Sequence, residues 1–179
     1  MADVTSQVLF AALILATGGE RLYEVALSKR NAAWAFERGG KEFGQRHYPF
    51  MVALHTALLL GCLAEVFLAD RPFIGWLGWP MLVIALGCQV LRYWCINTLG
   101  HQWNSRVIIV PGAGRVTGGP YRFFSHPNYA AVIAEGIALP LVHTAWVTAI
   151  VFTVVNAILL FGFRIPTEEK ALADLEPMT

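Results

Sequence analysis

A chain of 179 residues has room for one domain, and its 56% hydrophobic and 14% charged residues are the wrong balance for a soluble one. The formal net charge of +1 and the lack of a basic tract argue against a nucleic-acid partner. This composition predicts an all-α fold, that of a polytopic integral membrane protein.

About five stretches are predicted to cross the bilayer, because each approaches the roughly 20 apolar residues that a spanning helix needs. In chain order they cover residues 7–23, 50–69, 73–96, 127–142 and 146–163. The fourth is short, and the fifth follows it after a few residues, so these two are expected to form a C-terminal helical hairpin. We expect a single domain over residues 1–179, with three spans in 1–96 and a loop, the hairpin and a tail in 97–179.

Lys and Arg residues concentrate in residues 24–49 and 97–126, which are predicted to be soluble, and in the C-terminal tail. With five spans, these segments lie on one side of the membrane, and that side then carries ten of the thirteen Lys and Arg residues: Lys29, Arg30, Arg38, Lys41, Arg46, Arg106, Arg115, Arg122, Arg164 and Lys170. The far side carries Arg71, and His143 is expected at its interface. Short loops rich in Lys and Arg stay in the cytoplasm, so both loops and the C-terminus are predicted to be cytosolic.

Residues 118–129 combine glycines, aromatic residues and a His-Pro pair. Proline at the first position of a helix sacrifices no hydrogen bond, so Pro127 is expected to begin the fourth span with His126 as its cap. Tyr129 follows about one turn later and is expected to face the same cytosolic pocket as His126. The alternative is a loop that re-enters the membrane, with its aromatic side chains in an interfacial belt.

A second polar cluster follows the fifth span, where Arg164 precedes Pro166 and the pair Glu168-Glu169. One interpretation is a membrane anchor followed by an amphipathic helix with acidic residues in its favourable first turn. However, an Arg four residues before a Glu is the weaker orientation for a helix-surface pair, so the spacing also favours a functional role.

Together, G-P-Y-R-x-x-x-H-P-N-Y and, after the hairpin, R-I-x-x-E-E-x-A-L resemble the isoprenylcysteine carboxyl methyltransferase family. The resemblance runs from about Leu91 through the tail and includes residues 99–103. The first half, with Glu24, Ser28, residues 29–31 and residues 47–49, resembles a bacterial branch of this family. Members of that branch are often encoded beside type III polyketide synthases and methylate long-chain alkylpyrones or alkylresorcinols.

This resemblance implies a helical membrane methyltransferase that uses S-adenosyl-L-methionine. The cofactor contacts that it implies are Gln102, Val116, Gly119, Tyr121, His126, Pro127, Tyr129, Glu168 and Glu169. A carboxylate suits the ribose hydroxyls, and aromatic faces attract the cationic sulfonium.

The catalytic candidates are four polar residues, Arg122, Asn128, Glu135 and Arg164. Family members often have Arg directly before the His-Pro pair, where this chain has Ser125, and Arg122 is the candidate substitute. Asn128 and Glu135 are seven residues apart, hence on one helix face, and polar groups inside a membrane are costly without a role or a partner. The alternative for such residues is an interhelical pair, for example Glu135 with Asn156, or Arg92 with Glu24. No metal site is expected.

The expected function is O-methylation of a lipophilic acceptor by a cytosol-facing site in the bacterial inner membrane, in contact with membrane lipids and paired with a type III polyketide synthase pathway. An isoprenylcysteine-type carboxyl methyltransferase, a phospholipid N-methyltransferase and a non-catalytic membrane subunit are the alternatives. The substitution at Ser125 argues against a prenylated cysteine as the acceptor.

Overall fold

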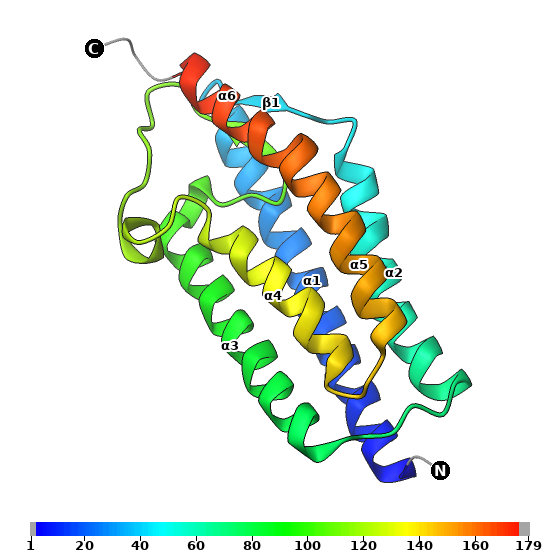
Figure 1. Ribbon diagram of the computed structural model, residues 1–179. Helices are drawn as coiled ribbons and strands as arrows, with labels where there is room; N and C mark the ends of the chain where they lie inside the picture. The colour runs from blue at the N-terminus through cyan, green and yellow to red at the C-terminus, as the bar shows by residue number, and fades with distance from the viewer. Residues whose placement is uncertain (1–2, 176–179) are drawn as a thin grey trace.

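The computed structural model describes residues 3–175, with side chains as far as Ala173. Six α-helices form most of it: α1 (Val4–Phe36), α2 (Tyr48–Leu68), α3 (Gly75–Leu99), α4 (Pro127–Leu141), α5 (Trp146–Leu159) and α6 (Ile165–Leu175) (Figure 1). A π-helical turn, η3 (Leu160–Arg164), joins α5 to α6, and two 3₁₀ turns, η1 (Gly100–Gln102) and η2 (Gly119–Arg122), lie between α3 and α4. Two short strands, β1 (Lys41–Phe43) and β2 (Val107–Ile109), complete the described chain.

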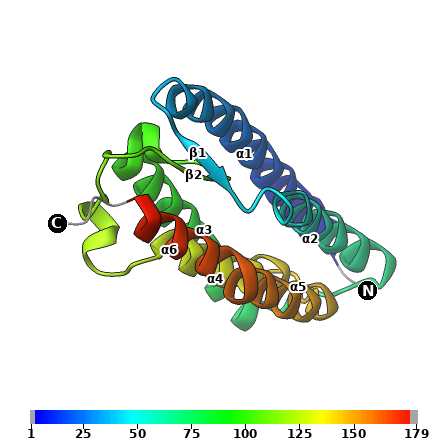
Figure 2. The same cartoon turned by 90° about the horizontal axis from the view of Figure 1, so that it is seen from above.

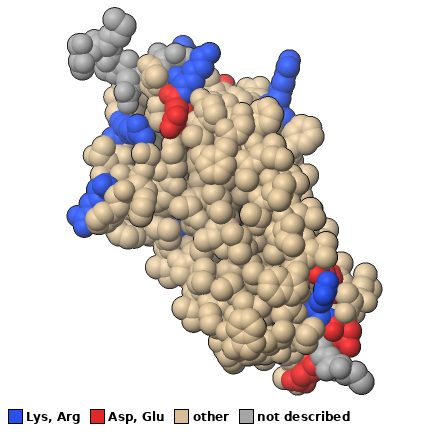
Figure 3. All heavy atoms as spheres, in the orientation of Figure 1, with Lys and Arg blue, Asp and Glu red and all other residues tan. Residues whose placement is uncertain are grey.

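The predicted class of an all-α, polytopic membrane protein is confirmed. Within residues 3–175, three helical segments are long and apolar enough to cross a membrane: Tyr48–Leu68, Gly75–Gln102 and Trp146–Ala173. Figure 3 shows the matching surface, with charged side chains at the two ends of the molecule and a broad uncharged band between them on this face. Embedding that band in lipid removes it from water.

The other two predicted spans are also helices, but neither combines the length and the apolar composition of these three. Helix α4 has only 15 residues and packs between α3 and α5, so its apolar surface is covered largely by protein (Figure 1). Helix α1 has 33 residues and continues to Phe36, so the prediction of a soluble loop from residue 24 is wrong for its first half. The reason is that Glu24, Ser28 and Asn31 recur at helical spacing and face inward, where they are buried.

The loop after α3 is fastened to the end of α1 by these inward-facing side chains. Asn31 donates from its side-chain amide to the carbonyl oxygens of Gly100, at 3.1 Å, and Trp103, at 2.8 Å. The Ser28 hydroxyl donates to the side-chain oxygen of Asn104 at 2.7 Å. Strand β1 pairs antiparallel with β2, with Glu42 opposite Ile108, between α1 and α6 in Figure 2. The two predicted loops and α6 therefore gather at one end of the bundle.

A buried network of charged side chains joins α1, α3 and α4. Glu24 accepts from Arg92 and from Arg21, each at 2.6 Å, and Glu135 accepts from Arg21 at 2.8 Å and from Gln89 at 2.9 Å. The pair of Arg92 with Glu24 is therefore confirmed, whereas Glu135 pairs with Arg21 in place of Asn156. Two cations and two anions balance each other, which is the arrangement that makes buried charge tolerable.

The opposite end of the bundle is closed by a buried histidine. His143 lies between the rings of Phe10 and Phe73, with 1% of its surface exposed, and its Nε2 lies 3.0 Å from the Ser6 hydroxyl. His143 is thus covered by protein, because the connection between α4 and α5 folds back against the start of α1.

Candidate functional site

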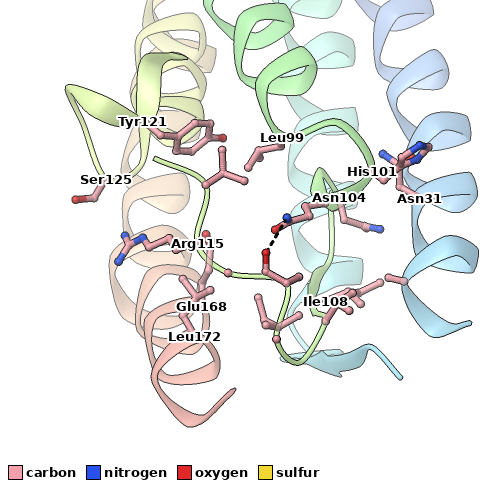
Figure 4. Close-up of a pocket in the computed structure, with 18 residues that line it drawn as sticks. Asn31, Leu99, His101, Asn104, Ile108, Arg115, Tyr121, Ser125, Glu168 and Leu172 are labelled. Atoms are coloured by element: carbon pink, nitrogen blue, oxygen red, sulfur yellow. Dashed lines mark hydrogen bonds between the residues drawn. The ribbon is translucent and has the colours of Figure 1, made fainter. Parts of the chain in front are cut away.

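A cavity of about 150 Å³ opens at the end of the bundle where the two loops and α6 meet. Glu168 and Leu172 of α6 form one wall, and Ile108 lies across the cavity from them (Figure 4). Tyr121 and Leu99 close the end nearest the membrane-spanning part of α3. The cavity thus combines a carboxylate with apolar and aromatic walls, as small-molecule sites commonly do.

Glu168 is held in this wall by a chain of hydrogen bonds that begins at Arg164. Arg164 Nε donates to the Tyr129 hydroxyl at 3.0 Å, and that hydroxyl donates in turn to Glu168 Oε2. Arg164 also donates from a terminal nitrogen to the Ser105 carbonyl at 2.7 Å and is 6% exposed. The three residues of the chain come from α4 and from both sides of the η3–α6 junction, so only the folded hairpin brings them together.

Local sequence explains how Arg164 turns inward directly after an apolar helix. The π-helical turn at Leu160–Arg164 adds a residue to the turn and so rotates α6 relative to α5. Pro166 lies just after this turn and has no N–H to donate back to it, so the regular α-helical bonding is interrupted at the same place. Such π-helical insertions are often found at functional sites.

His126 extends the cluster toward solvent. It caps α4 directly before Pro127, as predicted, and its ring stacks on that of Tyr129 with centroids 5.3 Å apart and 24° between the planes. Its Nε2 lies 3.2 Å from Glu169 Oε1, and its Nδ1 lies 3.8 Å from Glu168 Oε1. Glu169 is the outer member of the acidic pair, because its side chain is 58% exposed against 29% for Glu168.

The turn η2 places Tyr121 against α3. Gly119 has a φ of +54°, and a β-carbon there would come within 2.4 Å of Thr98 Oγ1, so this close approach requires glycine. Burial raises the pKa of Tyr121, and the neighbouring Cys95 and Glu168 raise it further. The phenol therefore stays neutral at physiological pH and offers the cavity a hydroxyl and an aromatic face.

His47, at the start of α2, adjoins the same cluster. Partial burial lowers the pKa of His47, and the nearby Arg164 cation lowers it further. Its ring fills the space above Gly44, where a β-carbon would lie 2.1 Å from His47 Cε1. The His47 imidazole is therefore neutral near pH 7, so the positive charge beside Tyr129 and Glu168 comes from Arg164.

The structure separates the predicted site residues into four groups. Gln102, Val116, Tyr121 and Glu168 line the cavity. His126, Tyr129, Arg164 and Glu169 surround Glu168 without lining the cavity. Pro127 and Gly119 have clear structural roles, as helix start and close-packed turn.

The remaining candidates lie away from the cavity. Arg122 is exposed, with its guanidinium 4.4 Å from the centroid of the Phe123 ring. Glu135 lies about two turns down α4 in the buried charge network. Asn128 has a buried side-chain oxygen that finds no hydrogen-bond partner among the described residues. None of these three lines the cavity.

Five polar residues of the cavity were not predicted as site residues from the sequence: Asn31, His101, Asn104, Arg115 and Ser125. Asn31 and Asn104 hold the loop to α1, while the ring of His101 stacks on Trp34 with centroids 5.2 Å apart. Arg115 supplies the cavity with a cation that Arg122 does not supply. The inward helical spacing of Ser28 and Asn31 was a usable signal, whereas Arg115 sits in a glycine-rich loop without one. Among residues 3–175 no group of His, Cys, Asp and Glu could hold a metal ion.

Comparison of the sequence with known proteins gives two matches that are relevant to this site. The sequence matches the isoprenylcysteine carboxyl methyltransferase (ICMT) family over residues 81–174, which include the loop, the hairpin and nearly all of α6. The chain is also similar to a protein of Bacillus subtilis (strain 168) described as "Uncharacterized protein YpbQ", with 39% identity over 156 residues, 87% of this chain and 91% of that protein. The chain therefore belongs to the isoprenylcysteine carboxyl methyltransferase family, a family of membrane methyltransferases.

Proposed function

We propose that this protein transfers the methyl group of S-adenosyl-L-methionine to an oxygen of a long-chain lipidic acceptor, such as an alkylpyrone, an alkylresorcinol or a carboxylate. The observation that carries the proposal is Glu168, a carboxylate in the wall of a cavity with both apolar and polar walls, fixed by Tyr129 and Arg164. A preorganised carboxylate of this kind accepts strong hydrogen bonds from a vicinal diol.

The cavity residues fit the parts of this cofactor. Glu168 can accept from the ribose hydroxyls, and Leu99, Ile108 and Leu172 offer apolar walls to the adenine. Tyr121 offers an aromatic face to a cationic sulfonium, and Arg115 offers a charge to the carboxylate of the amino-acid part. The volume of about 150 Å³ is below the roughly 300–1,000 Å³ of typical ligand sites, so a bound cofactor would have to extend past the cavity toward its rim.

When bound, the sulfonium supplies an electrophilic methyl group. The chain has to hold the acceptor oxygen in line with that group and to exclude water. An ionised acceptor, such as a carboxylate or an acidic enol, needs no base. A resorcinol would need a proton acceptor, for which His126 and Glu135 are the candidates. We favour His126, because Glu135 is already engaged by Arg21 and Gln89, whereas His126 lies beside Glu168 of the cavity wall.

We place the site on the cytosolic face of the bacterial inner membrane. The two loops and α6, which carry most of the Lys and Arg residues, gather at the end of the bundle that holds the cavity. Short cytoplasmic segments carry an excess of these residues. A cytosolic site also suits a cofactor made in the cytosol and an acceptor delivered by a type III polyketide synthase.

Ligand binding tests the proposal directly. Protein purified in detergent is titrated with S-adenosylmethionine, S-adenosylhomocysteine and NADPH by calorimetry, as wild type, Glu168→Gln and Glu169→Gln. We expect the two adenosyl ligands to bind and NADPH not to bind, with affinity reduced about tenfold by Glu168→Gln, or about 1.4 kcal/mol. Glu169→Gln is the matched control and should change affinity much less, since Glu169 is mostly exposed.

Lack of adenosyl-ligand binding by the wild type would overturn the proposal. If the ligands bind, a radiolabelled methyl-transfer assay on membrane lipid extract then identifies the acceptor. A label recovered in a base-labile ester, a stable ether or a methylated amine distinguishes a carboxylate, a hydroxyl and an amine as the methylated group.

A further inference from the structure

The elbow formed by the end of η2 and the residues that lead into α4, residues 121–125, has two faces. Tyr121 and Ser125 line the cavity, while the two phenylalanines between them point outward. Phe123 is 58% exposed and Phe124 is 65% exposed, so the rest of the described chain leaves more than half of each residue uncovered. Two adjacent exposed aromatic residues at the mouth of a site need a partner that removes them from water.

The charge beside the phenylalanines indicates which partner. The guanidinium of Arg122 is exposed and lies over the ring of Phe123, 4.4 Å from its centroid. An aromatic pair next to an outward-facing cation is the combination found where a protein surface enters the headgroup layer of a membrane, with rings among the upper acyl chains and the cation at phosphate level.

The height of the elbow in the bundle agrees with this partner. Gly119 lies so close to Thr98 that a β-carbon would not fit, and the Tyr121 phenol lies near the Cys95 thiol, so η2 rests on the last two turns of α3. Figure 1 shows the yellow-green elbow beside that end of α3. Helix α3 belongs to a membrane-spanning segment, and its nearby Trp94 and Val90 are 47% and 70% exposed. The elbow is thus continuous with a lipid-facing surface at the level where a span leaves the bilayer.

We propose that Arg122, Phe123 and Phe124 form a membrane contact, in which the two rings insert below the headgroups of the bilayer and Arg122 binds lipid phosphate. The wall of the cavity then lies at the membrane surface. An amphiphilic acceptor can reach the cavity along the elbow without passing through water. This last consequence rests on the proposed function, whereas the membrane contact does not.

Spin labelling measures the contact independently of any enzymatic activity. The three native thiols, Cys62, Cys88 and Cys95, are 0%, 6% and 0% exposed, so Phe124→Cys adds a readily accessible thiol. The purified variant is labelled with a nitroxide and reconstituted in vesicles of phosphatidylcholine with phosphatidylglycerol. Collision rates with oxygen and with a water-soluble nickel complex then report the depth of the label. Wild type treated in the same way gives the background.

Two further labels calibrate the depth. Val90→Cys gives a reference label on the lipid-facing side of α3. Gln45→Cys gives a second reference label at an exposed position between β1 and α2, at the cavity end of the bundle. We expect the label at residue 124 to collide with oxygen several-fold more often, relative to nickel, than the label at residue 45 does, and to approach the ratio at residue 90. Phe123→Cys is a second, independent position on the same elbow and should give the same ordering.

A label at residues 123 and 124 that is as nickel-accessible as that at residue 45 would overturn the proposal. Strong dipolar broadening between labels would also overturn it, because a second copy of the chain would then cover the elbow. Binding of S-adenosylhomocysteine in detergent, measured on the same samples, keeps the two proposals separate, since the membrane contact can fail while the cofactor site stands, and the reverse.

Discussion

Arg164 Nε donates a hydrogen bond to the Tyr129 hydroxyl over 3.0 Å and so ties the residue that ends the last membrane-spanning apolar run to the first turn of α4. The Tyr129 hydroxyl donates its own hydrogen bond to Glu168. Arg164 therefore orients the Glu168 carboxylate in the cavity wall through Tyr129, without contacting it directly. Cofactor affinity should therefore depend on residues that do not line the cavity.

Removing the middle of this chain of hydrogen bonds tests that dependence. Tyr129→Phe leaves Arg164 and Glu168 without their shared partner, and a lost bond to a charged group costs about 1.5–3 kcal/mol. We expect Tyr129→Phe to bind S-adenosylhomocysteine at least about tenfold more weakly than wild type, measured by calorimetry. Adding Arg164→Gln to Tyr129→Phe should weaken binding little further. Tyr23→Phe removes a phenol oxygen from the exposed side of α1 and should bind normally. Additive losses in the double variant would mean that the two residues act separately.

The cavity cation should be Arg115 and not Arg122. Arg115 lines the cavity, whereas Arg122 is exposed over Phe123. We expect Arg115→Ala to weaken binding of S-adenosylhomocysteine about tenfold, as loss of a charge-assisted contact to its carboxylate does. Arg122→Ala should leave the affinity within about twofold. The reverse order would assign the contact to the arginine beside the His-Pro motif.

The buried charge network should matter for stability. Glu135→Leu leaves Arg21 with one fewer buried anion, which typically costs about 3–5 kcal/mol. The balanced variant Arg21→Met/Glu135→Leu keeps the Arg92–Glu24 pair and should recover much of the loss. Thermal unfolding in detergent measures both. An unchanged midpoint for Glu135→Leu would show that the network is dispensable and would make Glu135 a catalytic candidate again.

Gly119 and Gly118 form a matched pair of adjacent glycines. Alanine at position 119 meets both a positive φ and the Thr98 side chain, which together should cost about 1–3 kcal/mol and displace Tyr121. Alanine at position 118 meets no atom within 4 Å at a φ of −83° and should be tolerated. We expect a lowered thermal midpoint and weaker cofactor binding for Gly119→Ala only. Equal effects of the two substitutions would contradict the close-packing argument.

Lowering the pH should destabilise the end of the bundle that contains His143. Burial lowers the pKa of His143, so the folded protein keeps it neutral while the unfolded chain takes up a proton below about pH 6.5. The stability due to neutral His143 is therefore complete above that pH and is lost as the pH falls through the folded-state pKa. We expect the thermal midpoint to drop from about pH 7.5 to about pH 5 more steeply for wild type than for His143→Gln. Parallel curves would show that protonation of His143 does not contribute.

Elements set by local patterns were predicted from the sequence to within a few residues. The fourth and fifth segments, expected at 127–142 and 146–163, are found as α4 (Pro127–Leu141) and as α5 with its π-helical continuation. Proline at the helix start and apolar run length are local signals and suffice for this. Helix α1 was underestimated because a buried polar face resembles a soluble loop when only hydropathy is read.

The same distinction between local sequence signals and long-range contacts applies to the site. Residues 119–129 and 164–172 could be identified because each motif is contiguous, and the structure brings Tyr129 and Glu168 into contact across the hairpin. Arg115, the ordered loop over Asn31 and the pairing of Arg21 with Glu135 could not be predicted, since each depends on partners from distant segments.

The sequence by itself determined that this is a helical membrane protein with its two polar motifs on either side of one hairpin, because length, hydropathy and proline positions act locally. Only the tertiary structure decided which polar residues meet. It directed Glu168 into the cavity, Glu135 into the charge network and Arg122 outward, because those outcomes depend on helix rotation and on packing between segments far apart in the chain.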